Sequence, residues 1–155
     1  MEMTYDNILS WIKEYFDIYS KYGQEPETAD RMKEYFAPDL RFIPYIAPIG
    51  GPDGGFKSRD EFIRTAVGHT GWYEKLTPME ITIDERRKTV AVLFLIDVYD
   101  RNTGKVTVRR SAFSHYDLVL DEKNTIKIKI IKFFWEVLPV GVPEFFEIYP
   151  EKPRK

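Results

Sequence analysis

Apolar residues near the start of the chain recur at spacings of three and four, which is the pattern of an amphipathic helix. The stripe runs through residues 6–21 and consists of Ile8, Trp11, Ile12, Tyr15, Phe16 and Tyr19. Gly23 follows it and is predicted to end the helix in a left-handed conformation, which glycine adopts at little cost. The pattern therefore predicts one long helix with a single buried face.

Two further helices are predicted before the chain changes its periodicity. The first begins at Pro26, a residue favoured in the first helical turn, and stops at Pro38. The second begins at Ser58, whose spacing from Glu61 is that of a capping box, and runs to Val67. Together with the N-terminal helix, these segments predict three helices in the first half of the chain.

The rest of the chain has strand character, with apolar and polar residues alternating. Five strands are expected, over residues 40–45, 76–84, 88–100, 105–120 and 125–137. Because helices come first and a run of strands follows, the predicted fold class is α+β, with three N-terminal helices packed in the concave face of a curved antiparallel sheet. One domain is expected over residues 1–138, with an irregular tail over 139–155 and a glycine- and proline-rich loop over 44–55.

Composition narrows the possible functions. The chain has 155 residues, 23 Lys and Arg against 25 Asp and Glu, and no cysteine. A net charge of −2 argues against extended electrostatic binding to a nucleic-acid backbone. The lack of cysteine excludes disulfides and thiolate metal sites. The longest apolar run is seven residues, residues 90–96, so no membrane helix is expected. The start of the chain lacks the pattern of a secretion signal, and a cytoplasmic location is expected.

Two hairpins set the predicted register of the sheet. In residues 101–105, Gly104 is suited to the left-handed position of a tight turn, and Asn124 has the same role in residues 121–125. The first turn pairs Tyr99 with Thr107, Asp97 with Arg109, Leu95 with Ser111, and Ala91 with His115. The second pairs His115 with Ile131, Phe113 with Phe133, and Ser111 with Trp135.

Because side chains alternate along a strand, this register predicts two different sheet faces. The face expected to line a cavity under the helices carries Leu93, Leu95, Phe113, Ile131, Phe133 and Trp135, with Ser111, His115, Asp97 and Arg109 among them. The other face carries Val90, Val92, Phe94, Ala112, Ile130 and Phe134, with Lys132, Arg110 and Glu136. Cross-strand pairing of Arg110 with Glu136 suits a subunit interface, so a homodimer through this outer face (Arg110, Lys132, Phe134) is expected.

Several short segments resemble the SnoaL-like branch of the nuclear transport factor 2-like superfamily. They are Tyr-Phe at 15–16, Tyr-Phe-Ala-Pro-Asp-Leu-Arg-Phe at 35–42, Ser-Arg-Asp-Glu-Phe at 58–62, His-Tyr-Asp-Leu at 115–118 and Phe-Phe-Trp-Glu at 133–136. The resemblance covers roughly residues 5 to 137. It implies a cone-shaped α+β barrel with a deep apolar pocket and a dimer formed through the outer sheet face.

Members of that superfamily include polyketide cyclases, ketosteroid isomerase, dehydratases, limonene-epoxide hydrolase and binders without activity, so the fold does not select a reaction. Asp97 falls where the epoxide hydrolases carry the Asp of an Arg-x-Asp pair, and Leu95 replaces the Arg. Phe133 stands where the last strand of these enzymes, and of the cyclases, contributes an inward carboxylate. This departure separates the chain from epoxide hydrolysis and from a cyclase with the usual acid of that family.

His115 and Asp97 are the leading candidates for proton chemistry. An imidazole in apolar surroundings stays neutral and can move a proton, although a core histidine bonded to a backbone carbonyl gives the same pattern. Asp97 is expected either to assist His115 or to form a cross-strand ion pair with Arg109. Tyr15, on the first helix, is a candidate hydrogen-bond donor to a carbonyl oxygen, or a plain core residue.

The remaining candidates bind rather than react. Flat apolar walls suited to a ring are offered by Trp72, Phe113, Phe133 and Trp135, and Leu95 is a further apolar contact. Ser111 and Arg109 are polar contacts at the same face. His69 follows the third helix and either reaches the pocket rim or bonds to the last helical carbonyls. The two histidines and Asp97 lack the spacing of a metal site, so no metal and no other cofactor is expected.

These candidates favour a small-molecule enzyme that transfers a proton next to a carbonyl or hydroxyl of an apolar, oxygenated, cyclic compound. Isomerisation, dehydration and ring closure all belong to that class. The alternative is a domain of the same fold that binds a hydrophobic ligand or a protein without turnover.

Overall fold

The computed structural model describes residues 1–45 and 55–135. The helical segments within these ranges are α1 (Tyr5–Gln24), the 3₁₀ helix η1 (Pro26–Glu34), and α2 (Arg59–Phe62), which continues as a wider turn η2 (Ile63–Val67). The strands are β1 (Phe36–Tyr45), β2 (Trp72–Asp84), β3 (Thr89–Asp100), β4 (Val106–Leu120) and β5 (Ile126–Trp135). The predicted α+β order of helices followed by strands is confirmed, and the predicted tail lies outside the described residues.

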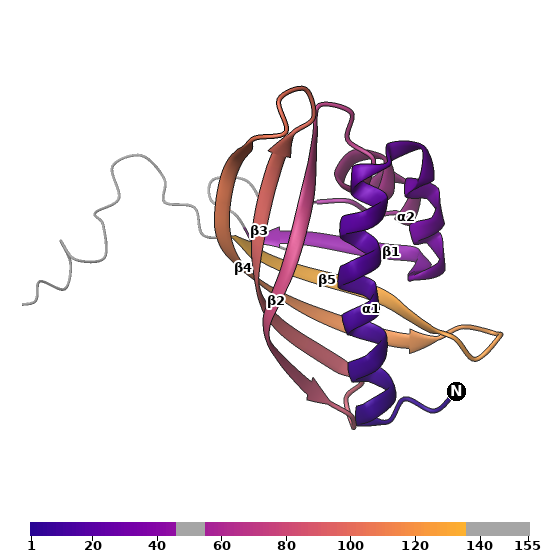
Figure 1. The fold of residues 1–155 in the computed structure, drawn as a ribbon. Helices are drawn as coiled ribbons and strands as arrows, with labels where there is room; N and C mark the ends of the chain where they lie inside the picture. Colours follow the sequence, from indigo (N-terminus) through magenta and orange to yellow (C-terminus); the bar gives the residue numbers. More distant parts are fainter. Residues whose placement is uncertain (46–54, 136–155) are drawn as a thin grey trace, which may run out of the picture.

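The strands form one curved sheet that wraps around α1 (Figure 1). The strand order is β1-β5-β4-β3-β2, and consecutive strands from β2 to β5 pair antiparallel. β1 pairs parallel with β5, with Phe42 opposite Ile131, which the sequence did not indicate. Two parallel neighbouring strands cannot be joined by a hairpin. Here the connection from β1 to β5 consists of all the helices and strands that lie between them in the chain.

The predicted stripe of α1 is buried against the sheet, and Ile8, Ile12 and Phe16 are fully enclosed. Thr4 caps the helix by accepting a hydrogen bond from the Asn7 N–H at 3.3 Å. The predicted left-handed end at Gly23 is wrong, because α1 continues to Gln24 and Gly23 has no positive φ.

The C-terminal end of α1 is held by a side chain from the β3–β4 hairpin. The Arg101 guanidinium donates hydrogen bonds to the carbonyl oxygens of Gly23 and Gln24, the latter at 3.0 Å. Its Nε donates to the carbonyl oxygen of His69 at 2.9 Å, in the turn before β2. A helix leaves its last carbonyls without partners, so this cation satisfies them where the negative end of the helix dipole lies.

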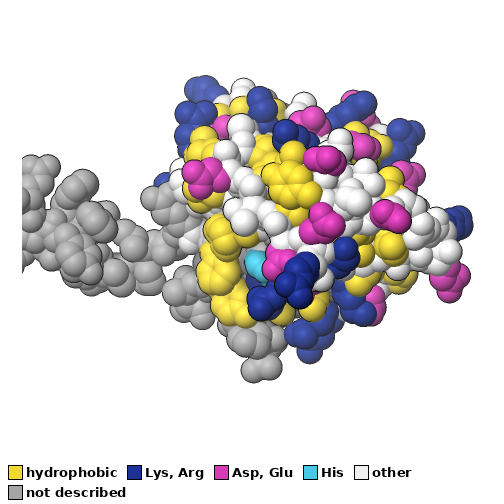
Figure 2. Space-filling view, turned by 90° about the horizontal axis from the view of Figure 1, so that it is seen from below, with side chains coloured by type: hydrophobic (Ala, Val, Ile, Leu, Met, Phe, Trp, Pro, Cys, Tyr) yellow, Lys and Arg dark blue, Asp and Glu magenta, His cyan; other side chains and the backbone are white. Residues whose placement is uncertain are grey.

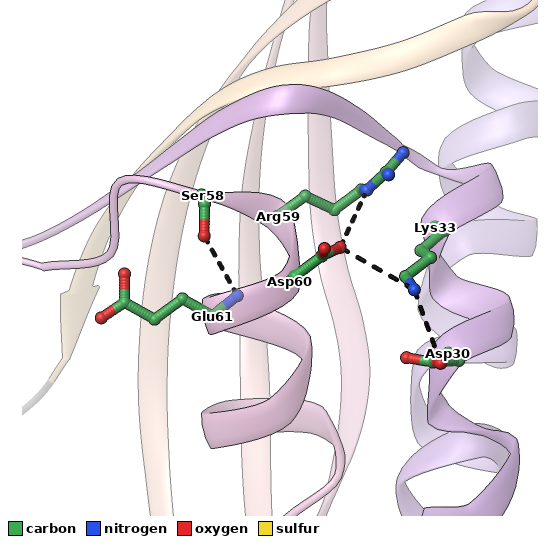
Figure 3. Close-up of polar contacts among 6 residues, drawn as sticks. All are labelled: Asp30, Lys33, Ser58, Arg59, Asp60 and Glu61. Atoms are coloured by element: carbon green, nitrogen blue, oxygen red, sulfur yellow. Dashed lines mark hydrogen bonds and ion pairs between the residues drawn. The ribbon is translucent and has the colours of Figure 1, made fainter.

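The third helix begins as predicted. The Ser58 hydroxyl accepts a hydrogen bond from the Glu61 N–H at 3.2 Å (Figure 3). Figure 3 also shows Asp60 between Arg59, at 3.4 Å, and Lys33 of η1, at 3.9 Å, so α2 is tied to the preceding 3₁₀ helix. The second helix differs from the prediction, since it is a 3₁₀ helix that ends at Glu34 and leaves Pro38 inside β1.

Both hairpins have the predicted turn residues in left-handed conformation, with φ of 68° at Gly104 and 60° at Asn124. The β3–β4 register confirms three predicted pairs: Asp97 with Arg109, Leu95 with Ser111, and Ala91 with His115. The fourth predicted pair is wrong, because a shift next to the turn places Val106 opposite Tyr99.

The predicted β4–β5 register is wrong by one residue. Next to the turn Leu118 pairs with Ile128, as the prediction requires, but Asp117 pairs with Ile130. One extra residue of β5 is therefore accommodated there as a bulge. Beyond it, Phe113 pairs with Phe134, His115 with Lys132, and Ala112 with Trp135.

The predicted assignment of the two faces of β3 and β4 is also wrong. The side chains packed beneath the helices are Val90, Val92, Phe94 and Ile96 of β3, and Ala112, Ser114 and Tyr116 of β4. The bulge changes the parity of β5, so Ile131, Phe133 and Trp135 face the same core as these residues. Residues 90–96 are apolar at every position, so hydrophobicity gave no basis for choosing between the faces.

The surface carries both signs of charge. On the face shown in Figure 2, Lys and Arg side chains are interspersed with Asp and Glu side chains. In the described part of the chain, no helix is long and apolar enough to cross a membrane.

Replacing Arg101 with Ala is expected to lower the free energy of unfolding by about 2 kcal/mol, since it leaves helix-terminal carbonyls without their charged donor. Urea denaturation followed by circular dichroism measures the change. Arg87→Ala is the control, because the Arg87 side chain is 83% exposed and lies near Asp84 of its own turn, at 3.7 Å. Equal stability of the two variants would show that Arg101 does not hold α1.

Candidate functional site

A cavity of about 130 Å³ lies between α1, α2 and the concave side of the sheet. Most of its wall is apolar or aromatic, and its polar side chains are few. The lining residues are Tyr15, Tyr19, Phe42, Phe62, Ala66, Glu74, Leu76, Phe94, Ile96, Ser114, Tyr116, Ile131, Phe133 and Trp135. An apolar enclosure with a few polar groups is the usual form of a small-molecule site.

Among the described residues that line this cavity, Glu74 is the one with a carboxylate. It lies on β2, two residues before the buried Leu76, so alternation turns both side chains toward the core. The Tyr19 hydroxyl donates a hydrogen bond to Glu74 Oε2 at 3.0 Å. Burial raises the pKa of Glu74 from 4.5 to about 7, and the hydrogen bond from Tyr19 opposes only part of that rise.

A neighbouring hydrogen-bond relay fixes Glu74 against α1. The Ser20 hydroxyl donates to the carbonyl oxygen of Phe16 at 3.1 Å and accepts from the Leu76 N–H at 2.9 Å. Ser20 thus joins the backbone of α1 to the backbone of β2, one residue from Tyr19 and two residues from Glu74. The pairing of Tyr19 with Glu74 therefore follows from the docking of the helix on the edge strand.

Two more tyrosines face the same space. The rings of Tyr15 and Tyr116 lie edge to face, with centroids 5.9 Å apart. Burial raises the pKa of both hydroxyls above 10, and for Tyr15 the nearby Tyr116 and Glu74 add to the rise. The Ser114 hydroxyl, beside Tyr116, partly offsets the rise there. Both phenols therefore stay protonated at neutral pH and can donate hydrogen bonds.

This combination is suited to proton transfer. A carboxyl group with a pKa about 7 is divided between its two forms at neutral pH, so it can take a proton and later return it. Protonated phenols in an apolar cavity stabilise negative charge that develops on an oxygen atom. In the described residues, no group of three or more His, Asp or Glu side chains is placed to hold a metal ion.

Three of the candidates from the sequence line the cavity: Tyr15 from α1, and Phe133 and Trp135 from β5. Phe133 and Trp135 pack edge to face with ring centroids 6.0 Å apart. Of the walls expected from β4, Phe113 is instead 41% exposed. Leu95 and Ser111, which pair across β3 and β4, share the side of the sheet that faces away from the helices.

His115 and Asp97 lie on that same outer side, so they do not meet in the cavity. His115 Nδ1 is 3.6 Å from Asp117 Oδ1, and Lys132 is its neighbour on β5. Asp97 forms the cross-strand ion pair that was one of the two expectations, with Arg109 Nε at 2.6 Å from Oδ1. His115 and Asp97 thus take part in two separate polar contacts on this side of the sheet, and Asp97 is itself buried.

His69 and Trp72 form a structural unit at the turn before β2. Their rings stack at 4.2 Å, and His69 Nδ1 accepts a hydrogen bond from the Gly71 N–H at 3.0 Å. Neither residue lines the cavity. The His69 carbonyl binds Arg101, so this turn takes part in fixing the end of α1.

The sequence reasoning missed Glu74, although a signal was present. Leu76 begins the predicted strand, and extending the alternation by two residues places Glu74 on its buried side. Tyr19 was identified as part of the helical stripe, but its carboxylate partner was not. The pairing of residues 19 and 74 depends on how the helix crosses the sheet, which alternation does not determine.

A second, larger hollow of about 940 Å³ is an open groove between α1, the start of β1 and the β4–β5 hairpin. Three of its cations, Lys33, Arg59 and Lys127, already have partners. Lys127 lies near Asp121 at 3.8 Å and donates to the Glu34 carbonyl oxygen, and Lys33 lies 3.5 Å from Asp30. The smaller, mostly apolar cavity around Glu74 is therefore the stronger candidate site.

The architecture, a cone of helices and a curved sheet, is similar to that of solved nuclear transport factor 2-like and SnoaL-like proteins. Among solved structures, ActVI-ORFA from Streptomyces coelicolor superposes with a TM-score of 0.59 at 11% identity, over 85% of this chain and 97% of that one. A nuclear transport factor 2-like protein from Salmonella enterica gives 0.55 at 16% identity, over 90% and 96%. A Jannaschia protein assigned to the SnoaL-like polyketide cyclases gives 0.56 at 13%, over 83% and 84%.

These likenesses agree with the superfamily that the short segments resemble, and at such identities they describe the fold alone. No protein-family model and no curated protein sequence matches the chain. The chemistry therefore has to be argued from the cavity itself.

Glu74 is expected to make stability depend on pH. Its pKa is higher in the folded protein than in the unfolded chain, so its contribution is fully present below pH 4.5 and is lost as the pH rises through about 7. The loss is up to about 3 kcal/mol. Urea denaturation between pH 4.5 and 8 should show this decline in the wild type and a smaller one in Glu74→Gln.

Glu80→Gln is the control for this comparison, because Glu80 is exposed on the same strand. It should keep the wild-type pH dependence. Identical slopes for the wild type and Glu74→Gln would contradict the raised pKa of Glu74.

Proposed function

We propose that the protein is a cofactor-independent enzyme that transfers a proton next to the carbonyl group of a small, apolar, cyclic compound. The observation that carries the proposal is Glu74, a carboxylate in an apolar cavity whose pKa is raised to about 7. Such a group is a general base of suitable strength at neutral pH. Isomerisation, dehydration and ring closure all begin with this step.

In the proposed step, a Glu74 carboxylate oxygen takes a proton from the carbon next to the carbonyl. The electron pair of the broken C–H bond forms a C–C double bond, and the carbonyl π electrons move to oxygen, giving an enolate. The Tyr15 and Tyr116 hydroxyls donate hydrogen bonds to that oxygen. Glu74 then returns the proton to the same carbon or to another, or to a hydroxyl that leaves as water.

The size of the cavity limits the substrate. An apolar cavity of about 150 Å³ accommodates one benzene ring. The volume of about 130 Å³ therefore supports a substrate with a single ring. Phe94 and Phe133 contribute flat walls on which such a ring can pack.

Cyclohexanone in D₂O is the probe for this proposal. Exchange of its α-hydrogens, followed by proton NMR, should be catalysed by the wild type and fall by at least about a hundredfold in Glu74→Gln. Since the base must be ionised, the enzymatic rate should rise with pH and be half-maximal near pH 7. Glu80→Gln should exchange the ketone as fast as the wild type.

The alternative function, a binder without turnover, gives a different result in the same experiment. Saturable binding of cyclohexanone with no exchange above the buffer rate would support the binder and overturn the enzyme. Exchange that is unchanged in Glu74→Gln would overturn the role of Glu74.

We further propose that the outer face of the sheet joins two copies of the chain. Phe113 and Phe134 are 41% and 42% exposed there, with ring centroids 6.1 Å apart, and Phe134 stacks on Tyr45 at 4.7 Å. Such a cluster of exposed aromatic rings is typical of an interface core. Of the residues expected at this interface, Phe134 and Lys132 share the face, whereas Arg110, which is exposed, alternates to the same side of β4 as Ala112.

Light scattering of the wild type at micromolar concentration should give the mass of a dimer. Phe113→Glu should give a monomer, because a carboxylate in the apolar centre would lose its hydration on association. Leu120→Glu is the matched control, since Leu120 is 37% exposed and alternates to the other side of β4. A monomeric wild type would refute the interface.

A further inference from the structure

Among the described residues, three tyrosines line the cavity, and Tyr19 differs from the other two in what its hydroxyl contacts. The Tyr19 hydroxyl donates a hydrogen bond to Glu74 Oε2 at 3.0 Å, whereas Tyr15 and Tyr116 donate to no carboxylate of the described chain. A phenol has a single proton to donate, so Tyr19 has none left for a ligand. The hydroxyls of Tyr15 and Tyr116 are therefore the ones left for the reacting oxygen, and Tyr19 acts on Glu74.

The Tyr19 phenol is held in place by its surroundings. Only 4% of the residue is exposed, and its ring packs edge to face on Tyr15 with centroids 6.0 Å apart. The next residue, Ser20, joins α1 to β2 by accepting a hydrogen bond from the Leu76 N–H at 2.9 Å. A phenol fixed on the helix in this way holds one carboxylate oxygen of Glu74 on the neighbouring strand.

The groups that face Glu74 inside the cavity carry no positive charge. The titratable ones are Tyr15 and Tyr19 from α1 and Tyr116 from β4. The lining side chains from β1, β3, β5, α2 and η2 are apolar or aromatic. A carboxylate in such surroundings depends on hydrogen-bond donors to stay ionised.

The cations on neighbouring elements are placed elsewhere. Lys75 follows Glu74 on β2 and alternates to the other side of the sheet. The Arg101 guanidinium is bound to backbone carbonyl oxygens of α1 and of the turn before β2. Burial raises the pKa of Glu74 to about 7, and the hydrogen bond from Tyr19 opposes that rise. Tyr19 is thus the lining residue that favours the ionised form of Glu74.

We infer that Tyr19 is a positioning residue, whose hydroxyl holds Oε2 of Glu74 so that Oε1 takes the proton from the substrate. This inference rests on the proposed function, because it assumes that Glu74 is the base. In the described part of the chain no group donates a hydrogen bond to Oε1, so its lone pairs are left for the reaction. Tyr19 acts through Glu74 and does not touch the ketone.

Tyr19→Phe is the test, because it removes the hydroxyl and keeps the ring that packs on Tyr15. The carboxylate then loses a charge-assisted hydrogen bond, so the pH at which exchange of cyclohexanone is half-maximal should rise from near 7 to about 8. At pH 6 the exchange rate should fall about tenfold, since about a tenth as much Glu74 is ionised. The KM for cyclohexanone should stay unchanged.

Tyr35→Phe is the matched control. The Tyr35 hydroxyl also donates to a glutamate, with Glu14 Oε1 at 2.8 Å, and that glutamate also lies on α1. Neither residue lines the cavity around Glu74. Loss of this second pair should leave the midpoint of exchange near pH 7 and the rate at pH 6 unchanged.

The carboxyl ¹³C resonance of Glu74 gives a readout that does not depend on activity. The signal absent from the spectrum of Glu74→Gln identifies it. Its titration midpoint should lie near pH 7 in the wild type and in Tyr35→Phe, and about one pH unit higher in Tyr19→Phe.

The outcomes separate the inference from the function on which it rests. If the wild type exchanges cyclohexanone and both midpoints stay near pH 7 in Tyr19→Phe, the proposed function stands and the role of Tyr19 is overturned. A raised KM in Tyr19→Phe with an unchanged midpoint would also overturn it, because Tyr19 would then bind the ketone directly. A wild type that catalyses no exchange overturns the proposed function, and the role of Tyr19 in the reaction fails with it.

Discussion

The docking of α1 on the edge strand β2 is the constraint on which the cavity depends. Ser20 joins the carbonyl of Phe16 to the N–H of Leu76, and Arg101 holds the last carbonyls of the helix from the opposite hairpin. With these contacts in place, the rotation of α1 about its axis is fixed. Tyr19 then meets Glu74 at 3.0 Å, and no further contact is needed to bring a phenol to this half-buried carboxylate.

The same docking explains why the carboxylate is basic. Packing against α1 displaces water from Glu74, and among the described residues the neutral Tyr19 hydroxyl donates the one hydrogen bond that replaces this water. Loss of hydration favours the neutral form, so the pKa rises. The fold therefore gives up stability at neutral pH to hold this group. A residue that lowers stability and has a pKa close to the working pH is a candidate functional residue.

Much of the fold was predictable because its signals are local. The stripe of α1, the cap at Ser58 and the left-handed turns at Gly104 and Asn124 each depend on a few adjacent residues, and each is present. The predictions that were wrong concern features set by residues far apart in the sequence. The bulge next to Asp117 is invisible in an alternating pattern, and a one-residue shift moves every later side chain to the other face. His115 and Asp97 were predicted to face the cavity because residues 90–96 are equally apolar on both faces of the strand, and the structure places both residues on the other side.

That ambiguity has a physical origin, since both faces of β3 have something to bury. Val92 and Phe94 pack under the helices, while Leu93 and Leu95 alternate to the outer side, next to the exposed ring of Phe113. A strand with one apolar face packs that face against a single core. A strand with two apolar faces has a second face that is stabilised when another surface packs against it. The apolar character of both faces, which made their assignment ambiguous, is thus also the basis of the proposed second subunit. Glu74 at the cavity and Asp97 on the outer side are polar residues that interrupt this apolar pattern.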